Sequence, residues 1–325
     1  MKAILTNGFG NPDVLYVGQT EMPKIGKHEV LVNVRACGIN RADTLQRMGK
    51  YPPPEGASDI LGLEVSGEIT ELGVSVEGWN VGDRICALID GGGYAEYVNV
   101  HQDMLIPLHD DLSFEEGAAI PEVFLTAYQS LHWLAKLQSD ERILIHAGAS
   151  GVGTAAIQLA KLMGANVVAT ASASKHDLCL ALGSDKAIDY RSTSFKEEIQ
   201  KMEITVDVIL DFIAGSYFSD NLDVLNRDGR MVMLGALGGL GAENINVAQI
   251  IWKRLSILGS TLRSRSQQYK KQLTHEFVKE IYPAFESGRL SPVIFETFNW
   301  TDVIKAHELM ERNENAGKLI LKIGE

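Results

Sequence analysis

Apolar and polar residues alternate along the first third of the chain, most regularly in EVLVNVRACGI (29–39). A period of two places successive side chains on opposite faces of a strand, so this stretch is predicted to be a half-buried β-strand. Similar short stretches follow at 67–73, 81–89 and 90–100, and the pattern predicts partly antiparallel strands in a barrel-like β domain. YPPPEGA (51–57) is predicted to be an exposed loop, because consecutive prolines lack N–H donors.

The pattern changes after Pro107. Residues 112–137 carry apolar side chains at helical spacing, with Ser113 as the N-cap and Glu116 as its capping-box partner. From 142 to 235, wholly apolar strands alternate with helices. Such strands are buried on both faces, so this part is predicted to be a doubly wound parallel sheet covered by helices.

A final strand, helix and strand lie within 293–324 and bury too little surface to form a domain of their own. We therefore expect three segments: 1–121, 122–261 and 262–325. The first and last form a β-rich domain, and the middle one forms a Rossmann domain. The predicted fold class is α/β.

Composition is that of a globular protein. Of 325 residues, 45% are hydrophobic, and the start MKAILTNGFG has too short an apolar run for a signal peptide. We expect a soluble cytoplasmic protein without a membrane segment. The net charge of -12 repels a phosphate backbone and argues against nucleic-acid binding. The three cysteines are too widely spaced for a disulfide framework or a multi-cysteine zinc site.

One local concentration of positive charge lies between 253 and 271. Its members are Lys253, Arg254, Arg263, Arg265, Lys270 and Lys271. The simplest interpretation is a solvated helix face, and the alternative is contact with a nucleotide phosphate or a second subunit.

IHAGASGVG (145–153) joins the first strand of the predicted parallel sheet to its first helix. A glycine-rich turn in this context is typical of a dinucleotide site, where the helix N-terminus binds the pyrophosphate. Gly148 permits a tight turn, and Gly153 permits close packing of helix and strand. Ser150 stands where the middle glycine is expected, and Gly151 can supply the close backbone approach. The alternative is a purely structural turn.

TASASK (170–175) ends the next strand, where an NAD site would place a carboxylate for the ribose hydroxyls. No carboxylate is present there to repel a 2′-phosphate, whereas Ser172 and Lys175 can bind one. The sequence therefore favours NADPH over NADH.

Several motifs together resemble the zinc-free quinone oxidoreductases of the medium-chain dehydrogenase/reductase superfamily, especially the tumour-suppressor-inducible, zeta-crystallin-like ones. They include GINRADTLQRMGKYPPPEGASDILGLEVSGEI, GGGYAEYV, AAIPEVFLTAYQSL, IHAGASGVGTAAIQLAK, DYR, STLRSRSQQYK and NAGKLIL. The resemblance covers the whole chain. It implies a GroES-like catalytic domain, a Rossmann domain, a cofactor cleft between them, and a homodimer joined through Rossmann edge strands.

Metal chemistry separates this chain from the zinc alcohol dehydrogenases of the superfamily. Where those enzymes carry a cysteine and a histidine ligand, this chain has Asn40 in GINRAD and Leu63 in GLE. An amide is a poor zinc ligand and a leucine is none, so no metal site is expected. Alcohol oxidation is difficult without a Lewis acid, whereas a quinone accepts a hydride without one.

By the resemblance, Asn40 lies near the nicotinamide and the substrate, and Tyr51 lies beside the substrate pocket, where its hydroxyl could bind the quinone oxygen or relay a proton. The alternatives are a turn-closing Asn40 and a surface Tyr51. Leu45 stands where some relatives carry a second tyrosine. Asp43, Glu64 and Gly62 match as structural residues, and His146 is interpreted as an oriented strand-end residue rather than a catalyst.

The implied cofactor contacts are Asn40, Thr126, Gly148, Ser150, Gly151, Val152, Gly153, Ser172, Lys175, Tyr190, Leu234, Gly235, Ala236, Leu237, Arg263 and Lys318.

The sequence thus predicts an NADPH-dependent, zinc-independent quinone oxidoreductase that transfers a hydride directly to a small-molecule quinone. Two alternatives keep the same cofactor site. One is an NADPH-dependent reductase of alkenal or enone C=C bonds, and the other is a crystallin-like protein that binds NADPH without an enzymatic role.

Overall fold

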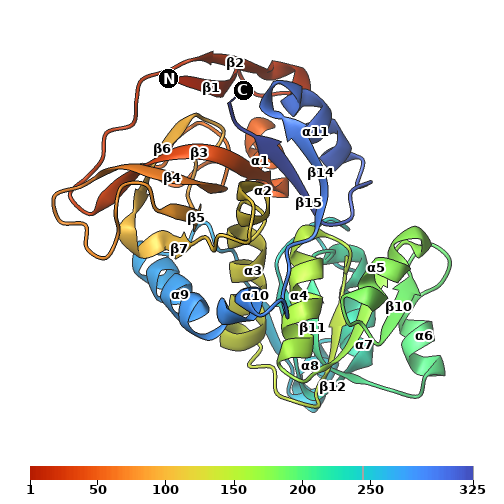
Figure 1. The fold of residues 1–325 in the computed structure, drawn as a ribbon. Coiled ribbons are helices and arrows are strands. Elements are labelled where there is room, and N and C mark those ends of the chain that lie inside the picture. The colour runs from red at the N-terminus through yellow and green to blue at the C-terminus, as the bar shows by residue number, and fades with distance from the viewer. Residues whose placement is uncertain (244, 325) are drawn as a thin grey trace. The chain divides into compact units, whose positions relative to one another are not determined.

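The structure is a computed structural model that describes residues 1–243 and 245–324. The chain forms two compact units (Figure 1). The first comprises Met1–Leu125 and Arg263–Glu325, and the second comprises Thr126–Leu262. The unit boundaries therefore fall after residues 125 and 262, where the sequence placed them after 121 and 261.

The first unit is built on a seven-stranded, mostly antiparallel sheet with the order β14-β15-β3-β4-β5-β7, in which β6 also pairs with β3. A separate antiparallel hairpin, β1 (Lys2–Thr6) and β2 (Leu15–Gln19), belongs to the same unit. The sheet strands are β3 (Glu29–Ile39), β4 (Glu64–Leu72), β5 (Arg84–Leu88), β6 (Tyr97–His101), β7 (Leu105–Pro107), β14 (Ile294–Asn299) and β15 (Lys318–Lys322). The helices of this unit are α1 (Arg41–Arg47), α2 (Phe114–Gly117), α9 (Gln267–Glu280), α10 (Pro283–Glu286) and α11 (Val303–Glu311).

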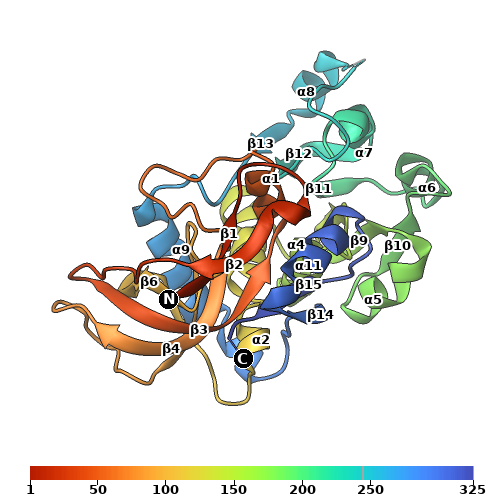
Figure 2. The same ribbon diagram turned by 90° about the horizontal axis from the view of Figure 1, so that it is seen from above.

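Two distant parts of the chain meet in this sheet. β15 pairs antiparallel with β3, so that Leu319 lies opposite Ile39 and Leu321 opposite Cys37. The blue C-terminal segment of Figure 2, with β14, β15 and α11, therefore belongs to the first unit. This pairing brings Lys318 to the carboxyl end of β3, where α1 begins.

The second unit contains a six-stranded sheet with the order β10-β9-β8-β11-β12-β13. Every pairing in it is parallel, which confirms the predicted doubly wound fold. Its strands are β8 (Arg142–Ile145), β9 (Asn166–Ala171), β10 (Lys186–Asp189), β11 (Val206–Asp211), β12 (Leu225–Met233) and β13 (Ser256–Gly259). Its helices are α4 (Gly151–Leu162), α5 (His176–Ala181), α6 (Phe195–Lys201), α7 (Phe218–Val224) and α8 (Val247–Lys253).

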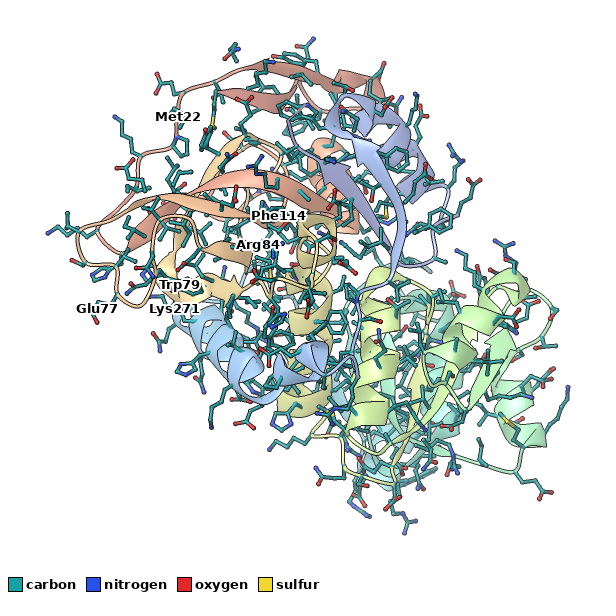
Figure 3. All side chains as sticks on the ribbon, viewed as in Figure 1. Met22, Glu77, Trp79, Arg84, Phe114 and Lys271 are labelled. Atoms are coloured by element: carbon teal, nitrogen blue, oxygen red, sulfur yellow. The ribbon has the colours of Figure 1, made fainter. Side chains whose placement is uncertain are left out.

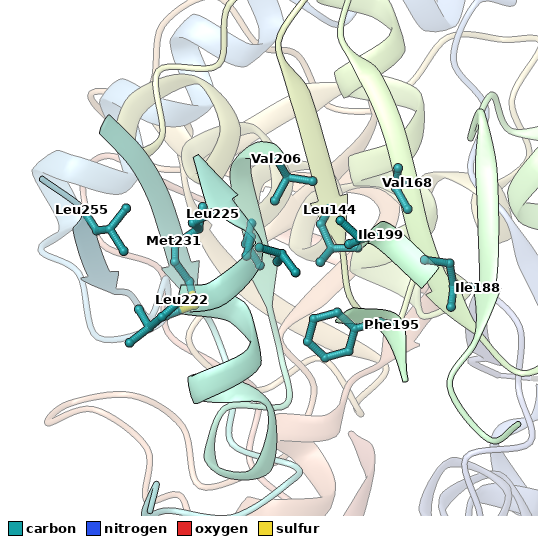
Figure 4. Close-up of a cluster of buried hydrophobic side chains, with 12 residues drawn as sticks. Leu144, Val168, Ile188, Phe195, Ile199, Val206, Leu222, Leu225, Met231 and Leu255 are labelled. Atoms are coloured by element: carbon teal, nitrogen blue, oxygen red, sulfur yellow. The ribbon is translucent and has the colours of Figure 1, made fainter. Parts of the chain in front are cut away.

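Burial of the apolar strands holds this sheet together. Leu144, Ile209 and Met231 from β8, β11 and β12 pack with Phe195 of α6 and Leu222 of α7 in one core cluster (Figure 4). These side chains have exposed fractions of 3% or less, and burying one of them contributes about 1.5 to 3 kcal/mol.

The helical stretch predicted at 112–137 is broken. The Ser113–Glu116 capping box starts α2 as predicted, but α2 ends at Gly117. α3 (Pro121–Tyr128) begins at a proline, and a π-helical turn, Gln129–Leu134, follows it. A proline has no N–H to donate and its ring crowds the preceding turn, so a new helix begins there.

The basic residues near 253–271 form a solvated face only in part, since Arg254 is exposed whereas Lys253 and Lys270 bind groups of the fold. Lys253 Nζ donates to the carbonyl oxygens of Leu222, Asp223 and Leu225 at 2.8 to 2.9 Å and so closes the end of α7. Lys270 is 4% exposed and its ammonium pairs with Asp90 at 2.5 Å. Lys253 and Lys270 thus satisfy carbonyl and carboxylate groups of the fold.

A buried polar group joins α1 to α11. Arg47 Nη1 lies 3.3 Å from His307 Nδ1, and Tyr94 Oη lies 3.0 Å from His307 Nε2. Arginine can only donate, so Nδ1 accepts and the proton of the neutral ring is on Nε2, facing Tyr94. Burial, with the charge of Arg47, lowers the pKa of His307 to about 3.

No helix in the described part of the chain is long and apolar enough to cross a bilayer.

Candidate functional site

A buried polar cluster lies where β3, β4 and β15 meet in the first unit. Lys318 Nζ donates to Asn40 Oδ1 at 2.7 Å and to the Ile39 carbonyl at 2.9 Å, and it pairs with Glu64 Oε1 at 2.6 Å. Asn40 Nδ2 donates to the same Glu64 oxygen at 2.9 Å. Both ends of the Asn40 amide are therefore held, and its orientation is defined.

Neighbouring residues make room for this cluster. Gly38 on β3 faces Glu64, and a Cβ at Gly38 would lie 2.1 Å from Glu64 Oε1 and 2.7 Å from the Ala118 carbonyl. Glu64 is fully buried on β4, and its Oε2 accepts the backbone N–H of Glu122 at 2.8 Å. A glycine at position 38 is thus required for a carboxylate to occupy this interior position.

Asp43 has the structural role predicted for it. Its Oδ2 accepts the Asn40 N–H at 2.7 Å, and its Oδ1 accepts the Gly62 N–H at 3.0 Å. The first bond caps α1, and the second ties α1 to the turn before β4. Glu64 is likewise the buried hydrogen-bonding acid that was predicted.

Tyr51, Glu122 and Arg263 interact electrostatically with one another in the first unit. The Arg263 guanidinium carbon lies 5.7 Å from the centre of the Tyr51 ring. Burial raises the pKa of Tyr51, the negative charge of Glu122 raises it further, and Arg263 opposes both effects. Tyr51 is half-buried.

Arg263 has one unused donor. Its Nε and Nη2 donate to the Asp90 carbonyl at 3.0 and 2.5 Å, whereas its buried Nη1 has no hydrogen-bond partner among the described residues. A buried guanidinium N–H without an acceptor is costly, so this atom is suited to bind a ligand oxygen.

Lys318 differs from Arg263 in this respect. Lys318 is 3% exposed, and its ammonium binds the Ile39 carbonyl, Asn40 Oδ1 and Glu64 Oε1. In this arrangement it orients Asn40 and has no donor left over for a cofactor phosphate.

The glycine loop of the second unit differs in detail from the expected geometry. The left-handed position is Ala147, with φ of 49°, rather than Gly148. Gly148 is needed for space, because a Cβ there would lie 2.8 Å from the Ala169 Cβ. Ser150 is the N-cap of α4 and its Oγ accepts the Gly153 N–H at 3.1 Å. The serine therefore has a local structural role that a glycine could not fill.

Gly153 is the residue of the loop with the least space. A Cβ there would lie 2.3 Å from the Ala147 carbonyl oxygen and 2.7 Å from the Gly148 carbonyl. The first turn of α4, with Gly151 and Val152, therefore packs directly on the loop backbone. Its N–H groups point to the carboxyl end of the sheet, where such sheets bind ligands.

The candidate phosphate residues lie at the ends of β9 and β10. Ser172 is buried and begins the short 3-10 turn Ala173–Lys175, in which Lys175 is half-buried. Tyr190 follows β10 and is 43% exposed. The next residue, Arg191, lies with its guanidinium carbon 5.8 Å from the Tyr190 ring centre.

The remaining predicted cofactor residues lie elsewhere in the second unit. The Thr126 hydroxyl is buried without a hydrogen-bond partner among the residues described. Leu234, Gly235, Ala236 and Leu237 follow β12, at the same sheet edge as the glycine loop.

His146 has structural partners in the second unit. It is fully buried, with Nε2 2.8 Å from Asn221 Oδ1 and Nδ1 3.1 Å from Thr170 Oγ1. Burial lowers its pKa, so the ring is neutral and links β8, β9 and α7. This agrees with an oriented strand-end residue rather than a catalyst.

The residues at the zinc-ligand positions of related dehydrogenases do not fit a metal. The Asn40 amide is held by Glu64 and Lys318, and Leu63 is an apolar side chain with 1% exposure. In residues 1–243 and 245–324, no group of three or more His, Cys, Asp or Glu side chains is arranged to hold an ion.

One hollow of the first unit is separate from these groups. It has a volume of about 1150 Å³ and is lined by Trp79, Arg84 and Lys271, which Figure 3 labels. Its charges pair with one another, since Arg84 lies 3.5 Å from Asp110 and Lys271 lies 3.0 Å from Asp103. None of the cluster around Asn40 lines this hollow.

Comparison with known proteins agrees with the two units. The alcohol dehydrogenase GroES-like domain matches residues 26–110, and the family of zinc-binding dehydrogenases matches residues 151–279. The quinone oxidoreductase of Mus musculus is 31% identical over 330 residues, covering 99% of this chain and 97% of that protein.

Two solved structures are similar along the whole chain. The quinone oxidoreductase from Coxiella burnetii has a TM-score of 0.80 at 30% identity, covering 100% of this chain and 99% of that one. The CurK enoyl reductase has a TM-score of 0.88 at 29% identity, covering 99% and 98%. A GroES-like unit with a Rossmann unit defines an oxidoreductase of the medium-chain dehydrogenase/reductase superfamily. Within it, this chain belongs to the family of quinone oxidoreductases of the zeta-crystallin type.

Proposed function

We propose that the protein is an NADPH-dependent quinone oxidoreductase that works without zinc, as the named activity of its relatives suggests. The observation that carries this proposal is the Asn40 amide, which Glu64 and Lys318 hold in place of a metal ligand. Bound NADPH supplies the hydride. A quinone needs only neutral hydrogen-bond donors at its oxygen, because the charge that develops there is delocalised over an aromatic ring.

The first unit offers such donors. Glu64 uses one of the two N–H groups of the Asn40 amide, which leaves the second for a ligand. The Tyr51 hydroxyl stays protonated because its pKa is raised, so it can donate to a carbonyl oxygen. In this proposal Asn40 and Tyr51 orient the acceptor and stabilise its developing oxyanion.

The second unit carries the proposed cofactor site, with the glycine loop at the pyrophosphate and Ser172, Lys175, Tyr190 and Arg191 around a 2′-phosphate. The unpartnered Thr126 hydroxyl of this unit supports a further contact to the cofactor. Lys318 acts through Asn40. We also infer that the chain falls in the tumour-suppressor-inducible branch of the family, on the motifs GKYPPP and AAIPEVFLTAY.

Replacing Lys175 by Ala is expected to raise the KM for NADPH about tenfold or more and to leave the KM for NADH unchanged. The reason is that a charge-assisted bond to the 2′-phosphate is lost and NADH has no such group. Initial rates with both cofactors measure the effect. Lys186→Ala is the matched control, because Lys186 is exposed and lies at the start of β10, at the end of the strand away from Tyr190. Equal changes for both cofactors would contradict the assignment.

We further propose a homodimer joined through the edge of the parallel sheet. β13 is an edge strand, and apolar side chains near it are exposed, including Ile251 at 69% and Trp252 at 71%. Exposed apolar patches of this kind are typical of subunit contacts. We expect the double variant Ile251→Glu/Trp252→Glu to sediment as a monomer and the wild type as a dimer. Leu180→Glu, on the exposed side of α5, should leave the dimer intact. A monomeric wild type would refute the proposal.

The acceptor is tested by following NADPH oxidation with ortho-quinones, para-quinones and 2-alkenals side by side. We expect rapid turnover of quinones. The second candidate is a C=C reductase, which the similarity to the CurK enoyl reductase favours. Turnover of alkenals but not quinones would establish that candidate, and saturable NADPH binding without any turnover would indicate a non-enzymatic role.

A further inference from the structure

Glu122 lies within the motif AAIPEVFLTAYQSL, but it is not among the predicted site residues. It is the second residue of α3, directly after Pro121. Its backbone N–H is held by Glu64 Oε2 at 2.8 Å, so its position is coupled to the cluster that orients Asn40. Its own carboxyl group makes no hydrogen bond or ion pair with any of the described residues.

The carboxyl group lies among groups that have unused hydrogen-bonding capacity. Its charge acts on Tyr51, and Arg263 acts on both. The Tyr51 hydroxyl also has no partner in the described chain, and Arg263 Nη1 is a buried donor without an acceptor. Glu122 and the Asn40 amide are joined through Glu64, which binds both, and the Arg263 guanidinium lies against the Tyr51 ring with a hydrogen-bonding capacity that a ligand oxygen could fill.

We infer that Glu122 is the acid that protonates the reduced substrate at this site, an assignment that rests on the proposed quinone reductase function. Hydride addition to a quinone gives a hydroquinone monoanion. The Glu122 carboxyl group then donates its proton to the phenolate oxygen, giving the neutral hydroquinone and a Glu122 carboxylate. The half-buried carboxylate recovers a proton from solvent, so no further reductant or oxidant is needed.

The electrostatic environment keeps this acid protonated at neutral pH. The charged groups around it are Glu64 on β4, Asp43 on α1, Lys318 on β15 and Arg263 after β13. Burial, reinforced by Glu64 and Asp43 against the two cations, raises the pKa of Glu122 to about 8. A phenol has a pKa of about 10, so transfer from Glu122 to the phenolate is downhill.

The Glu122→Gln substitution removes the proton that Glu122 could donate, but it keeps the charge of the side chain at pH 7 and nearly its shape. At pH 7 the protonated acid and the amide are both neutral and nearly isosteric, so a purely structural role predicts little change. Because Glu122 is the proton donor in this proposal, the kcat of Glu122→Gln is expected to fall on the order of a hundredfold relative to the wild type. The KM for NADPH should be unaltered. Glu286→Gln, on the exposed face of α10, is the matched control and should keep wild-type kcat.

The pH profile gives a second readout. The protonated form is required, so wild-type kcat should be level below pH 8 and fall above it as Glu122 loses its proton. Glu122→Gln should lack this break, and Glu122→Asp should restore it in part. Wild-type kcat and an unchanged break in Glu122→Gln would overturn the inference.

An infrared measurement tests the acid without any turnover. The wild type minus Glu122→Gln difference spectrum should contain a protonated carboxyl stretch at pH 6.5 that is gone at pH 9.5, and absence of this band at pH 6.5 would overturn the inference. If the wild type reduces no quinone at all, the proposed function fails and the assignment of the proton acceptor fails with it. If quinones turn over and Glu122→Gln is unaffected, only the proton donor is wrong.

Discussion

Replacing Lys318 by Met is expected to lower the free energy of unfolding by about 3 to 5 kcal/mol. The side chain is 3% exposed and lies 2.6 Å from Glu64 Oε1, and Glu64 is fully buried. Without the ammonium, the Glu64 carboxylate is left unpaired in the interior and Asn40 loses the donor to its Oδ1. This is a large share of the 5 to 15 kcal/mol that typically stabilises a folded protein.

Chemical denaturation measures this effect, and two variants control it. Glu64→Gln/Lys318→Met removes both charges and should recover most of the lost stability, since no buried charge is left unpaired. Lys322→Met, four residues along the same strand and exposed, should stay within about 0.5 kcal/mol of the wild type. If Lys318→Met were as stable as the wild type but bound NADPH weakly, Lys318 would be a cofactor contact and our account of the cluster would be wrong.

Acidification is expected to destabilise the protein through His307, between about pH 6.5 and pH 3. The native ring is neutral because burial and Arg47 lower its pKa to about 3, whereas the unfolded ring binds a proton near its ordinary pKa of 6.5. The unfolded state therefore binds more protons in this window. The contribution of His307 to stability is complete above pH 6.5 and is lost as the pH falls towards 3.

The size of this effect follows from about 1.4 kcal/mol per pKa unit, which gives about 2 kcal/mol at pH 5 and 4 to 5 kcal/mol near pH 3. His307→Gln has no such proton to gain, so its stability should fall less than that of the wild type between pH 7.5 and pH 5. His275→Gln, on the exposed side of α9, should follow the wild type. Parallel stability curves for wild type and His307→Gln would show that His307 takes no part in acid sensitivity.

The parallel sheet could be predicted because its signal is local. Strands such as β8 and β11 contain three successive apolar residues, 143–145 and 208–210, so each one indicates burial on both faces without knowledge of its neighbours. The capping box at Ser113 and Glu116 is likewise contained within four residues. The end of the helix at Gly117 was missed because the apolar spacing continues across Pro121.

The polar cluster could be predicted only in part, because its bonds join distant residues. Asn40 and Glu64 are 24 positions apart, and Asn40 and Lys318 are 278 apart. They meet because β15 pairs with β3 in one register, which neither strand reveals alone. Lys318 was thus predicted from a motif as a cofactor contact, although the register places its ammonium on Asn40 and Glu64. Glu122 was missed because a glutamate at the start of a helix is ordinary, and its surroundings come from strands far along the chain.

The most direct test of the account is quinone-dependent NADPH oxidation by purified protein whose zinc content is measured in the same sample, before and after treatment with a chelator. We expect saturable quinone turnover that the chelator does not diminish, in protein without stoichiometric zinc. Activity that disappears with the metal and returns when zinc is added would contradict it.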